Sequence, residues 1–237
     1  MSTEDVYRVP AAPRLLTALR ESASDFYYNS WRLVPANVVW GAGAMFLLFA
    51  ASVRPLAVLL LAPLLALPTA GLFRMAALIA RGDSVALSDA FDAWRAYLRP
   101  ALAAGVLFTV LALIFAVNVA VGVASNSFIG AMVAAFAGWG LLVLWTGALA
   151  FWPLLVDPRR AEMTIRERLR LVAILVIAFP LRLSTLALTL AVLLVLSTIV
   201  FAALITVSVA FSALVASRYI LPAADRLEGR ATELVLE

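Results

Sequence analysis

The fold is decided by two apolar runs separated by a short turn, residues 35–53 (PANVVWGAGAMFLLFAASV) and 56–80 (LAVLLLAPLLALPTAGLFRMAALIA). The turn is Arg54-Pro55, and Arg81-Gly82-Asp83 follows the second run. Each run is long enough to cross a bilayer, which takes about 20 apolar residues. The stretch therefore predicts a membrane-spanning helical hairpin.

The composition of the whole chain agrees with this interpretation. Hydrophobic residues make up 65% of the 237 residues and charged residues only 14%, whereas soluble domains average about 45–50% and about 25%. We therefore predict an all-α, polytopic membrane helical bundle with a single domain, residues 34–222. Residues 1–33 form an N-terminal segment and residues 223–237 a C-terminal tail.

Residue types that carry much of enzyme chemistry are missing from the sequence. The chain has no Cys and no His, and all 18 of its basic residues are Arg. These absences remove the thiol nucleophile, the commonest metal ligand and general base, and the Schiff-base amine. We expect no catalytic residue, no cofactor and no metal, and a protein that is not an enzyme. Because the Arg residues lie at the ends of apolar runs, we interpret the net charge of +4 as contact with anionic lipid rather than nucleic acid.

The segment before the first run has two open interpretations. Its apolar residues recur on one helical face, and Arg14, Arg20 and Asp25 lie off that face. The apolar residues are Leu15, Leu19, Ala23, Phe26 and Trp31. One interpretation is an amphipathic helix that lies on the membrane surface. The other is a disordered tail up to about Pro13, followed by a helix that extends the first span.

Prolines interrupt the second run. Pro63 and Pro68 each remove a backbone donor and crowd the preceding turn, which predicts a kinked or broken helix. Inside a membrane the freed carbonyl groups need partners within the protein or in a wet cavity. Leu67–Gly71 is therefore a candidate for close packing or for a small polar site around Pro68.

Arg74 is a charge well inside an apolar run. It lies seven residues before Arg81, roughly 10 Å deeper by helical rise, and an intramembrane charge is a candidate functional residue. Its candidate partners are Asp83, Asp92 and Asp157. The alternative is that Arg74 extends its side chain to the interface and that the three acids are helix caps and interface charges.

Two further spans follow, at about 100–124 and 128–156. Gly130, Ala134 and Gly138 repeat every four residues in the second of these. A stripe of small residues lets helices approach closely. It predicts packing, either within the chain or between copies in a homo-oligomer.

The uncharged run 183–217 is too long for one span. As a straight helix it would reach about 52 Å, against a hydrocarbon core of about 30 Å. We predict a break between Ser197 and Ser208, which gives two spans here and six in the chain.

Two amphipathic helices are expected between spans. The segment 82–99 has apolar residues at helical spacing, with Ser88 as a candidate N-cap. In the second, Thr164 and Glu167 fit a capping box, in which each side chain binds the other's backbone amide, and the helix ends near Pro180.

The Arg residues are distributed unevenly between the two ends of the spans. Those near residues 8–32, 81–99, 159–170 and 218–230 lie on one side of a six-span arrangement, and Arg54 lies on the other. By the positive-inside rule, both termini and both amphipathic helices face the cytoplasm.

Several short motifs resemble the YesL-like family of bacterial membrane proteins. They are Asn37-Val38-Val39-Trp40, Pro68-Thr69-Ala70-Gly71-Leu72, Arg81-Gly82-Asp83 and Phe91-Asp92-Ala93-Trp94. The resemblance implies a multi-pass protein of the bacterial cytoplasmic membrane. Because members often accompany genes for sugar uptake and polysaccharide use, it also implies a role near a carbohydrate transporter. It supplies no catalytic residues.

Two functions follow as expectations. The first is a non-enzymatic accessory component that associates with a sugar transporter or another membrane protein. The alternative is a small secondary transporter or channel for a small solute, which the broken second span and Arg74 favour. Against the alternative, no acidic residue lies in the middle of a span and no inverted repeat is evident.

Overall fold

The computed structural model describes residues 14–54 and 56–229, and within them the fold is all α-helical. Short 3₁₀ segments (η2, η3) and one π-helical segment (η4) interrupt or connect the α-helices. In chain order the elements are α1 (Leu15–Val53), α2 (Ala57–Leu61), η2 (Ala62–Leu65), α3 (Ala66–Ala80), α4 (Leu87–Ala96), α5 (Leu98–Ala124), α6 (Phe128–Val156), η3 (Pro158–Arg160), α7 (Ile165–Ala178), α8 (Pro180–Ile199), α9 (Phe201–Ala203), η4 (Leu204–Ser208) and α10 (Val209–Leu227).

The six predicted spans are confirmed for this part of the chain. Six helical segments are long and apolar enough to cross a membrane. They are α1, the unit from α2 to α3, α5, α6, α8, and the unit from α9 to α10. The chain is therefore a multi-pass membrane protein.

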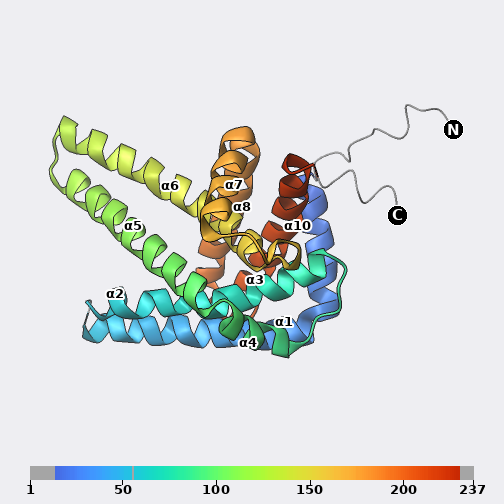
Figure 1. Ribbon diagram of the computed structural model, residues 1–237. Helices are drawn as coiled ribbons and strands as arrows, with labels where there is room; N and C mark the ends of the chain where they lie inside the picture. The colour runs from blue at the N-terminus through green and yellow to red at the C-terminus, as the bar shows by residue number, and fades with distance from the viewer. Residues whose placement is uncertain (1–13, 55, 230–237) are drawn as a thin grey trace.

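The first span and the segment before it form one helix. α1 runs without interruption from Leu15 to Val53 and contains Pro35. Figure 1 shows α1 bending between its two halves, and a proline within a helix is a common cause of such a bend. A helix is present in this segment, as both interpretations predict, and it is continuous with the first span. The tail expected before Pro13 lies outside the described residues.

The other expected breaks are also present. The second span is α-helical on both sides of η2, which contains Pro63, and Pro68 lies in the first turn of α3. The long uncharged run breaks at Val200, between α8 and α9. This position falls within the predicted interval between Ser197 and Ser208.

The core lies at the end of the bundle where α3, α6 and α10 meet. α10 is buried along most of its length by α1, α3 and α6, and residues 149–156 of α6 are also buried. Small residues such as Ala213 and Ala216 have no exposed surface, which lets the neighbouring helices approach α10 closely. α10 continues beyond residue 222, so Asp225 lies on this buried helix.

α5 and α6 form a hairpin that extends away from this core. Figure 1 shows it diverging from the hairpin of α1, α2 and α3. Its tip is tightly packed, because a Cβ on Gly122 would lie 2.5 Å from the Gly130 carbonyl oxygen and 3.0 Å from the Ala134 Cβ. A Cβ on Gly138 would meet nothing within 4 Å. Two members of the predicted stripe therefore pack within the hairpin, and the third faces open space.

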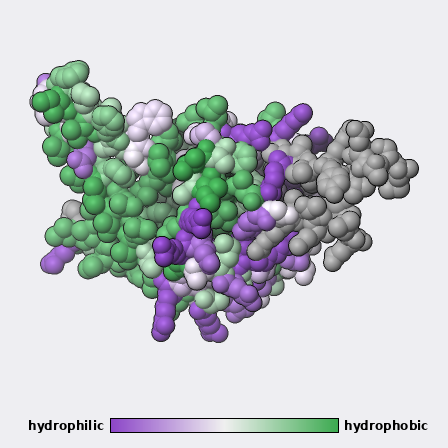
Figure 2. Space-filling model, turned by 45° about the horizontal axis from the view of Figure 1, so that its top comes forward, coloured by the Kyte–Doolittle hydropathy of each residue, from purple (hydrophilic) through white to green (hydrophobic). Residues whose placement is uncertain are grey.

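The polarity of the surface also differs between the projecting hairpin and the rest of the molecule. Figure 2 shows hydrophobic surface over the α5–α6 hairpin, and hydrophilic side chains gathered toward the opposite end of the molecule. We call this opposite end, formed by the last residues of α3, α6 and α10, the charged end. The division is typical of a protein whose hairpins lie in lipid.

Candidate functional site

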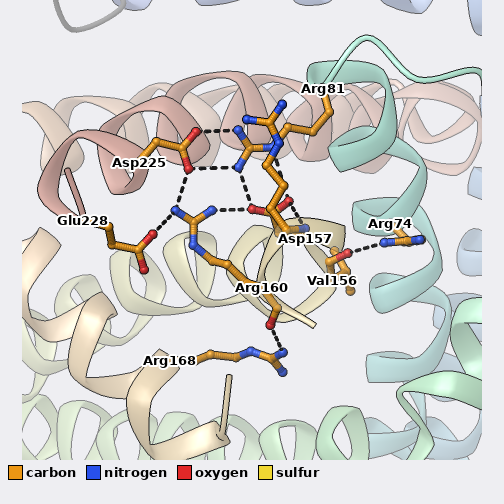
Figure 3. Close-up of polar contacts among 9 residues, drawn as sticks. Arg74, Arg81, Val156, Asp157, Arg160, Arg168, Asp225 and Glu228 are labelled. Carbon is orange, nitrogen blue, oxygen red and sulfur yellow. Dashed lines mark hydrogen bonds and ion pairs between the residues drawn. The ribbon is translucent and has the colours of Figure 1, made fainter. Parts of the chain in front are cut away.

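Five buried or partly buried ionic side chains meet at the charged end (Figure 3). They are Arg81, Asp157, Arg160, Asp225 and Glu228, and we call them the charge cluster. Arg81 follows α3, Asp157 and Arg160 follow α6, and the two other acids lie at the end of α10. The cluster joins the ends of three spans that are distant in sequence.

Local backbone signals position Arg81. Gly82 has a φ of +81°, a conformation that suits glycine at the end of a helix. The Gly82 amide donates to the Ile79 carbonyl, and the Asp83 amide to the Leu78 carbonyl, both at 3.0 Å. This pair of bonds is a Schellman motif. It ends α3 at a defined residue and places Arg81 at the charged end.

Arg81 binds two carboxylates with its planar fork. Its Nε and Nη2 donate to the Oδ1 and Oδ2 of Asp157 at 3.2 and 2.6 Å. Its Nη1 and Nη2 donate to the Oδ2 and Oδ1 of Asp225 at 2.5 and 3.1 Å. Both pairs are bidentate, the geometry in which an Arg–carboxylate pair is strongest.

Arg160 binds the same two carboxylates as Arg81, and also Glu228. Its Nη1 donates to Asp157, and its Nη2 donates to Asp225 at 2.7 Å and to Glu228 at 2.6 Å. The Arg160 side chain has no exposed surface, and neither has that of Asp157. Buried charges are tolerated when they are paired and hydrogen-bonded in this way.

The carboxylates keep both arginines charged. Burial by itself lowers the pKa of Arg81, but hydrogen bonds and charge from Asp225 and Asp157 outweigh it and raise the pKa above its ordinary value. Burial also acts to lower the pKa of Arg160, and Glu228, Asp225 and Asp157 raise it in the same way. Charges paired in this way are suited to holding helices together, and among the described residues the buried Arg160 Nε is a cluster atom without a hydrogen-bond partner.

Two more arginines bind backbone carbonyl groups beside the cluster. Arg74 donates from Nη1 to the Val156 carbonyl at 2.8 Å, and Arg168 donates from Nη2 to the Arg160 carbonyl at 2.6 Å. The ion pair expected for Arg74 with Asp83, Asp92 or Asp157 is therefore not what the structure contains. Asp157 is engaged by Arg81 and Arg160, and Arg74 binds the carbonyl one residue before it.

The other predicted acids lie apart from this site. Asp83 and Asp92 are exposed on either side of the start of α4. The helix begins at Leu87, two residues earlier than a Ser88 N-cap requires, and the Ala86 amide donates to Asp89 at 2.7 Å. The Ser88 cap was wrong, because the Asp89 carboxylate already satisfies the amide of the residue that precedes the helix.

The segment Leu67–Gly71 is a site of close packing. Thr69, one residue after Pro68, accepts a hydrogen bond from Trp40 Nε1 at 3.0 Å and donates to the Leu65 carbonyl at 2.7 Å. A Cβ on Gly71 would lie 2.8 Å from both the Ala90 carbonyl oxygen and Trp94 Nε1. This segment therefore fixes α1 and α4 against α3.

Four cluster residues were absent from the sequence-based candidates: Arg81, Arg160, Asp225 and Glu228. Asp225 and Glu228 were placed in a polar tail, because an acid that follows an apolar run is normally a solvated end. A spacing of three residues at a helix end puts both carboxylates on one face. This spacing was the feature of the sequence that could have indicated a shared site. Their partners are more than 60 residues away, and no local pattern records such a pairing.

An apolar cavity lies beside the aromatic part of the core. Two adjoining hollows of about 590 and 360 Å³ share Trp40, Thr69, Trp145, Ala148 and Trp152 in their walls. The six spans all contribute to these walls. We call the two hollows together the tryptophan cavity.

Among the described residues, no group of three or more acidic side chains is arranged to hold a metal ion. Searches of protein-family models, curated proteins and solved structures found no match to the chain.

Proposed function

We propose that this chain is a non-enzymatic membrane protein that serves as a partner subunit of another membrane component. The proposal places it in a bacterial cytoplasmic membrane with both termini in the cytoplasm. The motif resemblance to the YesL-like family suggests that the partner takes part in carbohydrate uptake.

The α5–α6 hairpin is the observation that carries this proposal. It extends from the core, and large apolar side chains such as Phe136 and Trp139 are about two-thirds exposed on it. Gly138 adds a position where a neighbouring helix can approach closely. The charge cluster, by contrast, engages its own residues internally. A rigid end with a projecting apolar hairpin suits a subunit that docks against another membrane helix.

The test is affinity capture from cross-linked native membranes, with mass spectrometry of the recovered proteins. The hairpin variant combines Phe136→Ala with Trp139→Ala. The matched control combines Leu60→Ala with Leu181→Ala, since both leucines are about 80% exposed but lie outside the hairpin. We expect transporter subunits with the unaltered protein and the control, and a several-fold smaller recovery with the hairpin variant. Recovery of this chain alone, or of copies of itself alone, would contradict the proposal.

A small-solute transporter or channel is the second candidate, and the tryptophan cavity favours it. Ion pairs that engage the ends of three spans resemble a closed gate on one side of such a cavity. Its test is solute flux into proteoliposomes, with the unaltered protein compared with Arg74→Ala. Flux equal to that of empty vesicles would count against this candidate.

A further inference from the structure

The tryptophan cavity is built for an apolar ligand. None of the side chains in its walls is ionisable. Most of its polar atoms are already engaged within the protein: Trp40 binds Thr69, and Trp145 Nε1 donates to the Ala187 carbonyl at 2.9 Å. A sugar or an ion needs several polar partners to leave water, and these walls do not supply them.

Two hydrogen-bond donors in the walls have no partner among the described residues. Trp152 is 8% exposed, lines both hollows, and its indole N–H makes no hydrogen bond there. Thr109 lines the larger hollow, and its hydroxyl also makes none. Thr146 shows the usual arrangement, since it donates to the Leu142 carbonyl at 2.8 Å. Neither donor is among the buried atoms that lack a partner, so both are accessible from the hollow, where a ligand that carries acceptors can satisfy them.

The depth of Trp152 in the bundle and the shape of the tryptophan cavity indicate which class of ligand fits. Trp152 lies five residues before Asp157, about 7.5 Å inside the charged end by helical rise. The larger hollow continues along α3 and η2 to Ala62, toward the opposite end of the bundle. The cavity therefore combines a donor nearer the charged end with an elongated apolar wall, and it lies within the spans themselves.

From this arrangement we propose that the tryptophan cavity binds one acyl chain of a membrane phospholipid. The chain lies along the aromatic wall, its ester carbonyl accepts a hydrogen bond from Trp152, and its headgroup remains outside because no charged residue lines the cavity. This binding does not depend on the partner proposed above, and it assigns the cavity to lipid rather than to a carbohydrate.

The test is photo-crosslinking of the full chain in phosphatidylcholine vesicles. A trace of phosphatidylcholine carries a diazirine in its acyl chain, and the adducts are mapped by mass spectrometry after irradiation. We expect adducts on the cavity wall around Trp152, in addition to adducts on lipid-facing residues such as Leu181, which is 82% exposed.

Two cavity-filling variants and one control decide the outcome. Ala148→Leu and Ala112→Leu place added volume in the cavity from α6 and from α5, and Ala135→Leu adds the same volume at an exposed position on α6. We expect both filling variants to lose the cavity adducts and to keep those at lipid-facing residues, and the control to keep both. Adducts confined to lipid-facing residues in the unaltered protein would overturn the proposal. So would cavity adducts that survive in both filling variants, or a different apolar molecule recovered from the cavity by solvent extraction.

Discussion

The side-chain amide of Asn37 spans the π-helical segment of the last span: its Oδ1 accepts from the Ala210 amide at 2.6 Å. Its Nδ2 donates to the Ile205 carbonyl at 2.5 Å. A π-helical turn disrupts the regular backbone ladder, and lipid offers no replacement partner. One buried amide in α1 therefore satisfies a donor and an acceptor of the irregular segment. The close approach depends on Gly41, where a Cβ would lie 2.8 Å from the Ile205 side chain.

Replacing this amide should destabilise the protein. In Asn37→Leu the Ala210 amide and the Ile205 carbonyl lose a buried partner, and each unsatisfied group costs about 1–3 kcal/mol. We expect a lower melting temperature in detergent, measured by intrinsic fluorescence. The control is Asn118→Leu, because Asn118 is exposed and binds a carbonyl of its own helix. Equal melting temperatures for the two variants would contradict a bridging role for Asn37.

Removing Arg81 should loosen the whole charged end. Arg81→Met leaves Asp157 and Asp225 buried with fewer partners, and breaking a buried pair in this way costs about 3–5 kcal/mol. The matched control is Arg95→Met, at an exposed position on α4. We expect a large loss of thermal stability for the first variant and almost none for the second. Similar melting curves would show that the charge cluster contributes little to the stability of the fold.

The positions of the spans could be predicted from the sequence, but their pairing could not. Length and hydropathy are properties of a single segment, so the fourth span was predicted at 128–156 and is found at Phe128–Val156. The break at Pro63 and the capping box at Thr164 and Glu167 also follow from local chemistry. Membrane helices, however, are apolar on the lipid face and on the packed face alike, so periodicity does not show which face meets a neighbour.

The contacts of the candidate site were even harder to predict from the sequence than the pairing of the spans. Arg74 stood out because a charge within a span is visible in the sequence, but its acceptor is a main-chain carbonyl, which any residue could supply. Arg81 and Asp225 are 144 residues apart, and they meet only because α3 packs against α10. The tryptophan cavity is likewise a product of packing, since Trp40 and Trp152 belong to different spans.

The cap of α7 should give the protein a pH-dependent stability. Glu167 accepts hydrogen bonds from the Thr164 amide and hydroxyl at 2.7 and 2.8 Å, and these bonds, the backbone one first, lower the pKa of its carboxyl below the ordinary 4.5. A lowered folded-state pKa means that the stabilisation is complete above 4.5 and is lost as pH falls through the lowered value.

The comparison is made with Glu167→Gln, which keeps the shape of the cap and removes its charge. We expect the unaltered protein to melt at a higher temperature than Glu167→Gln at neutral pH, and the difference to disappear as pH falls from about 7 to about 3. Glu162→Gln, at an exposed position before α7, should show no such change. A difference that stays constant across this range would mean that the charge of Glu167 does not contribute.

Two glycines in different environments give the last prediction, because the same substitution should destabilise the protein at one position and not at the other. At Gly71 a methyl group would lie 2.8 Å from the Ala90 carbonyl oxygen and from Trp94 Nε1, so α4 would have to move away from α3. Such overpacking costs about 1–3 kcal/mol. At Gly138 a methyl group would meet nothing within 4 Å, and alanine is favoured over glycine within a helix by about 0.5–1 kcal/mol. We therefore expect Gly71→Ala to lower the melting temperature in detergent and Gly138→Ala to leave it unchanged or raise it. If Gly71→Ala melts no lower than Gly138→Ala, α4 does not pack against α3 at this distance.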